Sequence, residues 1–175
     1  MGAYTPVEHA LQLKFGFSNR RFKKCILTEG IRDYYFYKMF FKLDGYEIIP
    51  GAGCDNLKDM ISILIGCSEQ FLVILDNDEQ GRGADKKYSN FFQESYIENK
   101  YLYSFKVGNL MLEDILTKED QAKIILATDI NEVKDAISKL YFNENILNDI
   151  IKGLSRETKQ NITKIKKDIN AHFNK

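Results

Sequence analysis

The chain has 175 residues, of which 44% are hydrophobic, so it can bury the core of one ordinary domain and does not have a disordered composition. Its 25 basic and 25 acidic residues cancel, which argues against a protein dedicated to coating nucleic acid. No apolar run approaches the ~18 residues of a membrane span, and residues 1–10 lack a signal-peptide core, so we expect a cytoplasmic protein with no membrane contact.

Four apolar runs predict buried strands, and segments with helical spacing lie between them. The predicted strands cover 25–28, 46–49, 71–75 and 101–105. The predicted helices cover 31–43, 57–65 and 84–97, and the last of them follows a turn at Gly81, Arg82 and Gly83. Near-continuous apolar strands that alternate with helices are typical of right-handed βαβ units. We therefore predict an α/β fold with a central, mostly parallel four-stranded sheet flanked by helices.

Beyond residue 105 the sequence pattern is helical. Residues 118–175 show helical spacing with breaks near Asn143 and Gly153. We therefore predict an N-terminal lead-in segment over 1–21, an α/β core over 22–116 and a helical C-terminal segment over 117–175 that packs on the core.

Carboxylates follow the predicted strands at the edge where open parallel sheets place their sites. Glu29 follows the first strand, and Asp33 lies one helical turn further on. Asp76 and Asp78 follow the third strand, and Glu113 comes after the fourth. Like charges that crowd one edge are costly without a cation, and oxygen ligands select Mg²⁺ or Mn²⁺.

Other kinds of site have less support in the sequence. The two histidines, His9 and His172, lie near opposite ends of the chain, which disfavours zinc and a Ser-His or Cys-His nucleophile. After the glycines of 51–53, Asn56 stands where a dinucleotide fingerprint needs its third glycine, and no P-loop lysine motif occurs. Three cysteines form no C-x-x-C pair and are expected as reduced, buried thiols: Cys25, Cys54 and Cys67.

Aromatic side chains crowd the predicted helix over 31–43. They are Tyr34, Tyr35, Phe36, Tyr37, Phe40 and Phe41. Spacings of three and four residues are more typical of a core than of a base-stacking platform, so we expect most of these rings in the core. Gly30, at the start of the helix, is expected to let the backbone turn sharply and approach a ligand.

Two segments resemble the signature motifs of the TOPRIM fold. They are Cys25-Ile-Leu-Thr-Glu29-Gly-Ile-Arg-Asp33 and Phe71-Leu-Val-Ile-Leu-Asp76-Asn-Asp78. The similarity covers residues 22–116, and the fold is shared by bacterial primases, topoisomerases, ribosomal-RNA maturases, recombination mediators and OLD-type nucleases. The resemblance implies a TOPRIM, Rossmann-like core.

Further segments resemble the C-terminal nuclease domain of the OLD-family (overcoming lysogenization defect) endonucleases. They are the tyrosines directly after Asp33, Ile49-Pro50-Gly51-Ala52-Gly53, Leu112-Glu113-Asp114-Ile115-Leu116 and Ser155-Arg156-Glu157-Thr158-Lys159. The last of these is similar to the segment that carries the family's active-site lysine.

The OLD resemblance implies an endonuclease that hydrolyses DNA phosphodiesters with two Mg²⁺ or Mn²⁺ ions. Asp76 and Asp78 are assigned to one ion. Glu29 and Asp33 are assigned to the other ion or to a bridging position.

A further ligand and a catalytic cation are implied by the same resemblance. Glu113 is the further ligand, and Asp114 stays open as the alternative. Lys159 would stabilise charge on the phosphate in the transition state. The implied catalytic set is Glu29, Asp76, Asp78 and Lys159.

The implied partner is nucleic acid, with DNA favoured over RNA. An ATPase domain or subunit outside this chain is a further expected partner, a homodimer stays open, and phage defence or DNA processing is the implied setting. The alternatives are a non-catalytic TOPRIM module for DNA binding or assembly, an RNA-maturation nuclease, and a strand-joining or primer-synthesising fragment. A response-regulator-like domain, with Lys106 after its last strand, is a more distant alternative.

Overall fold

The computed structural model describes residues 24–66, 70–92, 104–106 and 112–174. The predicted lead-in over 1–21, together with His9, Cys67 and residues 101–103, lies outside the described residues. The elements in chain order are β1 (Cys25–Thr28), α2 (Ile31–Phe36), η1 (Tyr37–Phe41), β2 (Glu47–Pro50), η2 (Cys54–Asn56), α3 (Lys58–Gly66), β3 (Phe71–Leu75), α4 (Glu79–Phe92), β4 (Ser104–Lys106), η3 (Leu112–Ile115), α6 (Lys118–Thr128), α7 (Val133–Tyr141), α8 (Glu144–Gly153) and α9 (Arg156–Phe173).

The strands form a parallel sheet in the order β2-β1-β3-β4. In this register Leu27 of β1 lies between Ile49 of β2 and Val73 of β3. β4 is short and pairs with the last residues of β3. All side chains of β1 and β3 are buried, as expected for strands covered on both faces. The predicted α/β class is confirmed.

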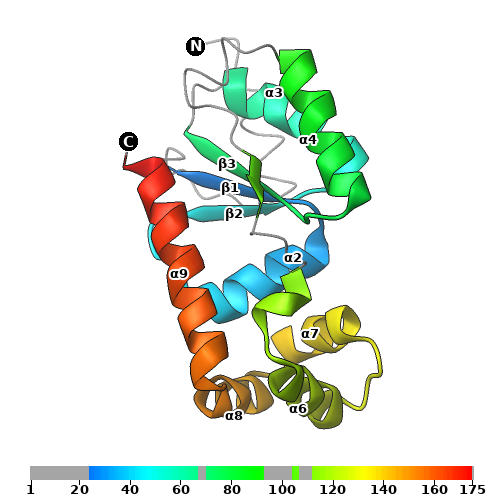
Figure 1. Cartoon of the computed structure of the whole chain (residues 1–175), viewed down its shortest axis with the longest axis vertical. Helices are drawn as coiled ribbons and strands as arrows, with labels where there is room; N and C mark the ends of the chain where they lie inside the picture. Colours follow the sequence, from blue (N-terminus) through cyan, green and yellow to red (C-terminus); the bar gives the residue numbers. More distant parts are fainter. Residues whose placement is uncertain (1–23, 67–69, 93–103, 107–111, 175) are drawn as a thin grey trace.

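Helices cover both faces of the sheet (Figure 1). α3 and α4 pack on one face through an apolar cluster that includes Leu27 and Tyr88. α2 and α9 pack on the other face, where a larger cluster includes Ile26, Phe36 and Ile169. Ile26 and Leu27 belong to different clusters because successive side chains of a strand point to opposite faces.

The helices α6 to α9 form the helical part that follows η3. Each is preceded by a capping residue whose side chain accepts a hydrogen bond from a backbone N–H of the first turn: Thr117, Glu132, Asn143 and Ser155. The predicted breaks near Asn143 and Gly153 fall at the two ends of α8. Among the described residues, no helix combines the length and apolar character needed to cross a bilayer.

The aromatic helix differs from the regular helix predicted over 31–43. α2 ends at Phe36 and continues as the π-helical turn η1, after which Lys42 is left-handed with φ 42°. A π turn holds more residues than an α turn, which lets the adjacent bulky rings of Phe40 and Phe41 both enter the core. Four rings are buried as expected: Phe36, Tyr37, Phe40 and Phe41. Tyr34 and Tyr35 are only partly buried.

The start of α4 also differs from the prediction. The glycines of 81–83 do not form a turn before the helix, because α4 already begins at Glu79. Asp78 caps it, since its Oδ1 accepts a hydrogen bond from the Gly81 N–H at 2.7 Å. A Cβ on Gly81 would lie 1.9 Å from the carbonyl oxygen of Asp76. The residue at this position is therefore a glycine because β3 and α4 meet too closely to leave room for a side chain.

Candidate functional site

The carboxyl ends of β1 and β3 bring several predicted acids together. Glu29 follows β1 and Asp76 follows the adjacent strand β3, and Glu29 Oε2 accepts a hydrogen bond from the backbone N–H of Asp76 at 3.3 Å. The negative charges of Asp33, Asp76 and Asp78 all act on the Glu29 carboxyl. Glu113, which lies in η3, is linked to this group because it shares a lysine with Asp76, as described below. We call these five acids the carboxylate rim: Glu29, Asp33, Asp76, Asp78 and Glu113.

The loop after β2 fixes the backbone at one side of the rim. Gly51 N–H donates to the Thr28 carbonyl and Gly53 N–H donates to the Glu29 carbonyl, both at 2.9 Å. A Cβ on Gly51 would lie 2.5 Å from the Thr28 carbonyl oxygen and 2.6 Å from that of Glu29. Only glycine permits so close an approach, and the approach holds Glu29 in place.

Two rim acids also cap the helices that follow the strands. Asp33 Oδ2 accepts from the Gly30 N–H at 2.8 Å, and Asp78 Oδ1 accepts from Gly81. Each bond uses one of two carboxylate oxygens, so neither prevents the side chain from coordinating an ion. The chain bends at Gly30 between β1 and α2, as expected. This bend does not require a glycine, because the Gly30 backbone is extended with φ −148° and a Cβ there would make only an ordinary contact with Asp33 at 3.6 Å.

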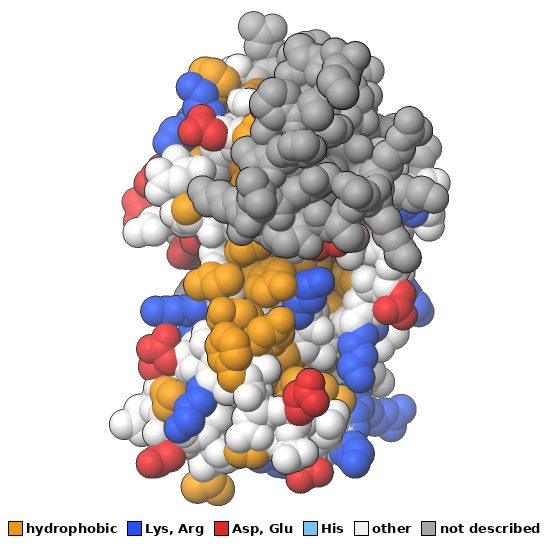
Figure 2. All heavy atoms as spheres, turned by 180° about the vertical axis from the view of Figure 1, so that it is seen from behind, with side chains coloured by type: hydrophobic (Ala, Val, Ile, Leu, Met, Phe, Trp, Pro, Cys, Tyr) orange, Lys and Arg blue, Asp and Glu red, His pale blue; other side chains and the backbone are white. Residues whose placement is uncertain are grey.

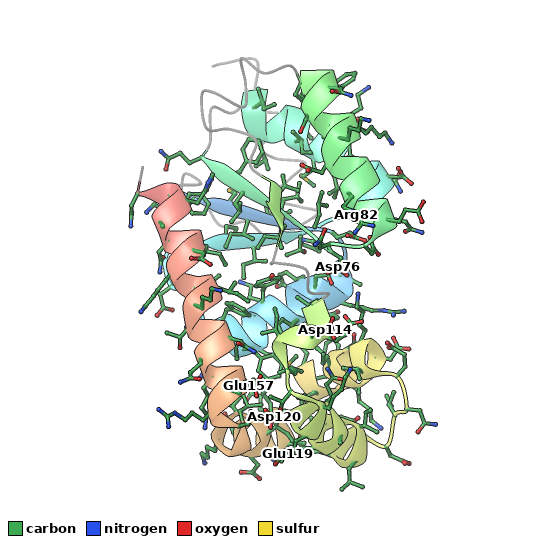
Figure 3. The ribbon with its side chains drawn as sticks, in the orientation of Figure 1. Asp76, Arg82, Asp114, Glu119, Asp120 and Glu157 are labelled. Carbon is green, nitrogen blue, oxygen red and sulfur yellow. The ribbon has the colours of Figure 1, made fainter. Side chains whose placement is uncertain are left out.

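Asp76 is contacted by a lysine that the sequence did not indicate. Asp76 Oδ1 accepts from the Leu112 N–H at 3.2 Å, and Oδ2 pairs with Lys134 Nζ at 2.8 Å. Lys134 Nζ also lies 3.4 Å from Glu113 Oε2. The side chains of Lys134, Asp76 and Glu113 are 20%, 12% and 21% exposed. Figure 3 shows Asp76 between the sheet and the helical part.

Burial and mutual repulsion perturb the rim carboxyls. Burial, followed by the charge of Asp76, raises the pKa of Asp33 to about 6 although Lys134 acts in the opposite direction. Burial is also the main cause that raises the pKa of Glu29. Burial alone would lower the pKa of Lys134, but its hydrogen bond and ion pair with Asp76 raise it. The rim therefore carries more negative charge than Lys134 neutralises.

Glu113 has an unsatisfied oxygen at this site. Its Oε2 is buried and accepts no hydrogen bond from any residue that the structure describes. The 3.4 Å separation from Lys134 Nζ gives an ion pair without hydrogen-bond geometry. A buried oxygen in this state is costly, and a cation would relieve the cost.

The donor chemistry of the rim fits a hard divalent cation. All five side chains offer carboxylate oxygens, which are the ligands that Mg²⁺ and Mn²⁺ prefer. Within the described ranges, however, no group of three or more Asp, Glu, His or Cys side chains is gathered closely enough to hold one ion. The rim fits such an ion by donor type and charge, whereas Lys134 pairs with two of its acids, Asp76 and Glu113.

Lys159 does not reach the rim. It lies exposed in the first turn of α9, where its Nζ donates to the Lys152 carbonyl at 3.0 Å. Glu157, two residues earlier, lies in the helical part well away from Asp76 in Figure 3. Lys134 of α7, by contrast, contacts two of the predicted acids, Asp76 and Glu113.

Of the two alternatives after the fourth strand, Glu113 is the one that faces Lys134. Asp114 lies 4.0 Å from Lys118 on the next helix, and its side chain is 38% exposed. Glu113 therefore fits the place of the further ligand better than Asp114.

A cavity of about 350 Å³ opens beside the rim. Its lining includes Glu29, Asp33, the loop 51–53 and two cations, Arg32 and Lys134. Arg32 is held by Asp135 at 3.3 Å and by Glu132. The cavity gives access to Glu29 and Asp33.

A second groove, of about 560 Å³, lies on α9. It is lined by Arg156, Lys159, Gln160, Thr163, Lys164 and Lys167. Figure 2 shows Lys and Arg side chains along the side of the molecule on which α9 runs. The volume of this groove exceeds that of the rim cavity, but its lining contains no carboxylate, so we regard the rim as the candidate site.

Comparisons with known proteins provide no relative from which to infer a function. No protein-family model, no curated protein and no solved structure matches the chain.

Proposed function

We propose that this chain is a TOPRIM-like nuclease domain that hydrolyses DNA phosphodiesters with divalent metal ions. The observation that carries the proposal is the carboxylate rim, where burial and like charge raise the pKa of Glu29 and Asp33. Such crowding is costly unless cations bind. Three features support the same proposal: the resemblance of the two motifs to the TOPRIM signature, the resemblance of the further segments to OLD-family endonucleases, and a parallel sheet with acids after β1 and β3.

The rim residues have distinct roles in this proposal. Two Mg²⁺ or Mn²⁺ ions, when bound, would supply activation of water and stabilisation of the leaving oxygen. Asp76 and Asp78 would hold one ion, Glu29 and Asp33 would hold the other ion or bridge the two, and Glu113 would be a further ligand. The loop 51–53 and the caps of α2 and α4 fix these side chains in place. DNA and an ATPase domain or subunit are the proposed partners.

Cleavage of supercoiled plasmid tests the proposal. The purified chain is incubated with plasmid in Mg²⁺, Mn²⁺ or EDTA, and nicked or linear product is expected only with metal. Glu29→Gln keeps size and polarity but removes one rim charge, and should slow cleavage by on the order of a hundredfold or more. Glu144→Gln, which changes an exposed acid at the start of α8, is the matched control and should cleave like wild type.

Two outcomes would contradict the nuclease proposal. One is cleavage in EDTA, which would remove the need for metal. The other is undiminished cleavage by a folded Glu29→Gln variant, with its far-ultraviolet circular dichroism unchanged. A parallel assay on single-stranded and structured RNA decides between a DNA nuclease and an RNA-maturation nuclease.

A non-catalytic DNA-binding module is the second candidate. The observation that favours it is the ion pair between Lys134 and Asp76, in which a cation of the protein itself already balances this acid. Such a module would bind DNA equally well in EDTA and in Mg²⁺, and Glu29→Gln would leave binding unchanged. Fluorescence anisotropy with labelled DNA, combined with the plasmid assay, separates the two candidates.

A further inference from the structure

The packing of α7 does not depend on the contact that Lys134 makes with the rim. α7 is already held to α2, because Arg32 pairs with Asp135 at 3.3 Å and with Glu132 at 3.9 Å. Three side chains of α7 are also buried in the large cluster: Ala136, Ile137 and Leu140. Lys134 has a flexible four-carbon stem, so its ammonium can leave Asp76 while α7 stays in place.

The ammonium and a metal ion compete for the same oxygen atoms. Lys134 Nζ lies 2.8 Å from Asp76 Oδ2 and 3.4 Å from Glu113 Oε2. A Mg²⁺ ion binds a carboxylate oxygen at about 2.1 Å, so an ion on Asp76 Oδ2 would lie within about 5 Å of an unmoved ammonium. Like charges at that separation repel strongly in a partly buried site.

We propose that Lys134 is the built-in counter-ion of the metal-free protein, and that a divalent ion displaces it from Asp76 and Glu113 when it binds. This inference rests on the proposed metal site and concerns what occupies the rim before metal arrives. The cavity beside the rim, which Lys134 already lines, receives the displaced ammonium. The buried Glu113 Oε2 then becomes available to the ion.

The proposal explains why the rim acids are not gathered for an ion in this structure. Asp76 and Glu113 are both arranged around Lys134 Nζ. With Lys134 present, the metal-free rim has an internal cation that reduces the repulsion among its acids. Metal binding is weakened by the free energy needed to break these ion pairs, so the protein selects ions that bind carboxylates strongly.

Mn²⁺ affinity, measured without substrate by electron paramagnetic resonance, is the first test. Lys134→Met removes the competing ammonium but keeps the apolar stem, and should bind Mn²⁺ about tenfold more tightly than wild type. Arg32→Gln removes one positive charge from the same cavity without touching the rim acids, and should change the affinity by less than about threefold. Equal effects of the two variants would overturn the proposal, because the charge would then act only at a distance.

Lys134→Arg is a second variant that keeps the charge. A guanidinium can hold Asp76 with two hydrogen bonds, so this variant should bind Mn²⁺ no more tightly than wild type. Circular dichroism of each variant shows whether it is folded. If Lys134→Arg binds Mn²⁺ as tightly as Lys134→Met, the gain does not come from removing a cation, and the proposal is overturned.

Chemical labelling follows the ammonium directly. Brief acylation with an N-hydroxysuccinimide ester, read by mass spectrometry, should label Lys134 slowly in EDTA and severalfold faster in saturating Mg²⁺. Lys87, which pairs with Asp55 at 3.1 Å on the surface, is the matched control and should label at one rate in both conditions. If Mg²⁺ binds and the rate of Lys134 labelling does not change, the proposed displacement of Lys134 is wrong, whereas the proposed metal site is supported. If neither wild type nor Lys134→Met binds Mn²⁺, the proposed function fails together with this inference.

Discussion

At the scale of single residues, this protein stabilises buried acids in two contrasting ways. Asp120 is fully buried, and its carboxylate accepts hydrogen bonds from Thr158 Oγ1 at 2.6 Å and from the Ser155 N–H at 3.0 Å. Lys123 also pairs with Asp120 at 3.2 Å. In the rim, by contrast, a single lysine, Lys134, is shared by Asp76 and Glu113. Asp120 is therefore a structural acid that joins α6 to α9, whereas the rim acids belong to the site for which a divalent cation is proposed.

Asp120 gives a pH-dependent prediction. Burial would raise its pKa, but the hydrogen bonds from Thr158 and Ser155 outweigh burial and hold the pKa below its usual range. Because the folded-state pKa is the lower one, this stability is complete above the unfolded value of ~3.9 and is lost as the pH falls below it. The free energy of unfolding in urea should therefore fall between about pH 5 and about pH 3 by on the order of 1 kcal/mol more in wild type than in Asp120→Asn. Equal pH dependence in the two proteins would contradict this role.

A variant of Asp33 tests whether the rim carboxylates repel one another in the absence of metal. Asp33→Asn removes a charge close to Asp76 and keeps an oxygen that can accept from the Gly30 N–H. In EDTA at neutral pH the variant should be more stable than wild type by on the order of 1 kcal/mol, and Mn²⁺ should stabilise it less. Thermal unfolding measures both effects. Asp149→Asn, on an exposed position of α8, is the control and should shift stability by less than about 0.5 kcal/mol. A lower melting temperature for metal-free Asp33→Asn would mean that its capping bond outweighs the repulsion.

At the scale of elements, the junction between β3 and α4 positions two rim acids, and Gly81 is its tightest point. Gly81→Ala would bring a Cβ to 1.9 Å from the Asp76 carbonyl oxygen, so the junction has to shift. We expect a loss of about 1–3 kcal/mol in the free energy of unfolding, together with weaker Mn²⁺ binding. Gly83 lies two residues further along α4 with no atom within 4 Å of a built Cβ, so Gly83→Ala should be neutral or stabilise by up to about 1 kcal/mol. Denaturant titrations measure the free energy of unfolding. If it changes equally in both variants, the junction at Gly81 can shift to accept a side chain without cost.

The strands and the acids after them are local features, and the sequence predicts them well. The runs over 25–28 and 71–75 match β1 and β3, because buried strands in a parallel sheet are near-continuous in apolar residues. The start of α4 is missed because Gly81 and Gly83 are typical of turns, while the cap by Asp78 and the contact with Asp76 depend on the fold.

Lys134 could not be predicted as a site residue from any local pattern. It is 58 positions from Asp76 in sequence, and it reaches the rim only because α7 packs on α2. The segment with Lys159 resembles a family motif, and yet α9 carries Lys159 into contact with Lys152. Motif spacing specifies which side chains share an element, whereas the placement of a distant helix is decided by tertiary packing.

At the scale of the whole molecule, one apolar cluster joins the sheet to the helical part. It includes Ile26 of β1 together with Ile137 of α7 and Ile169 of α9. Ile169 is fully buried, so Ile169→Ala should destabilise the protein by about 2–5 kcal/mol. Leu126→Ala, at a position that is 85% exposed, should change stability by less than about 0.5 kcal/mol.

The shared cluster also predicts that the two parts unfold together. Urea unfolding of wild type and of Ile169→Ala should give one transition, with the same midpoint by circular dichroism and by tyrosine fluorescence. Separate transitions for the helical part and the sheet would show that the cluster does not couple them.

The position of α9 has a consequence for how the chain folds during synthesis. α9 is the last helix described, and yet its Phe173 stacks edge-on against Tyr46 beside β2, with ring centroids 5.1 Å apart. On the ribosome, β1 and β2 emerge long before α9 is made. Until then the sheet face that contains Ile26 and Leu72 lacks its final cover, and exposed apolar surface of this kind binds chaperones or aggregates. The nascent chain should therefore stay bound to a holdase chaperone until α9 is released, and only then should the sheet close.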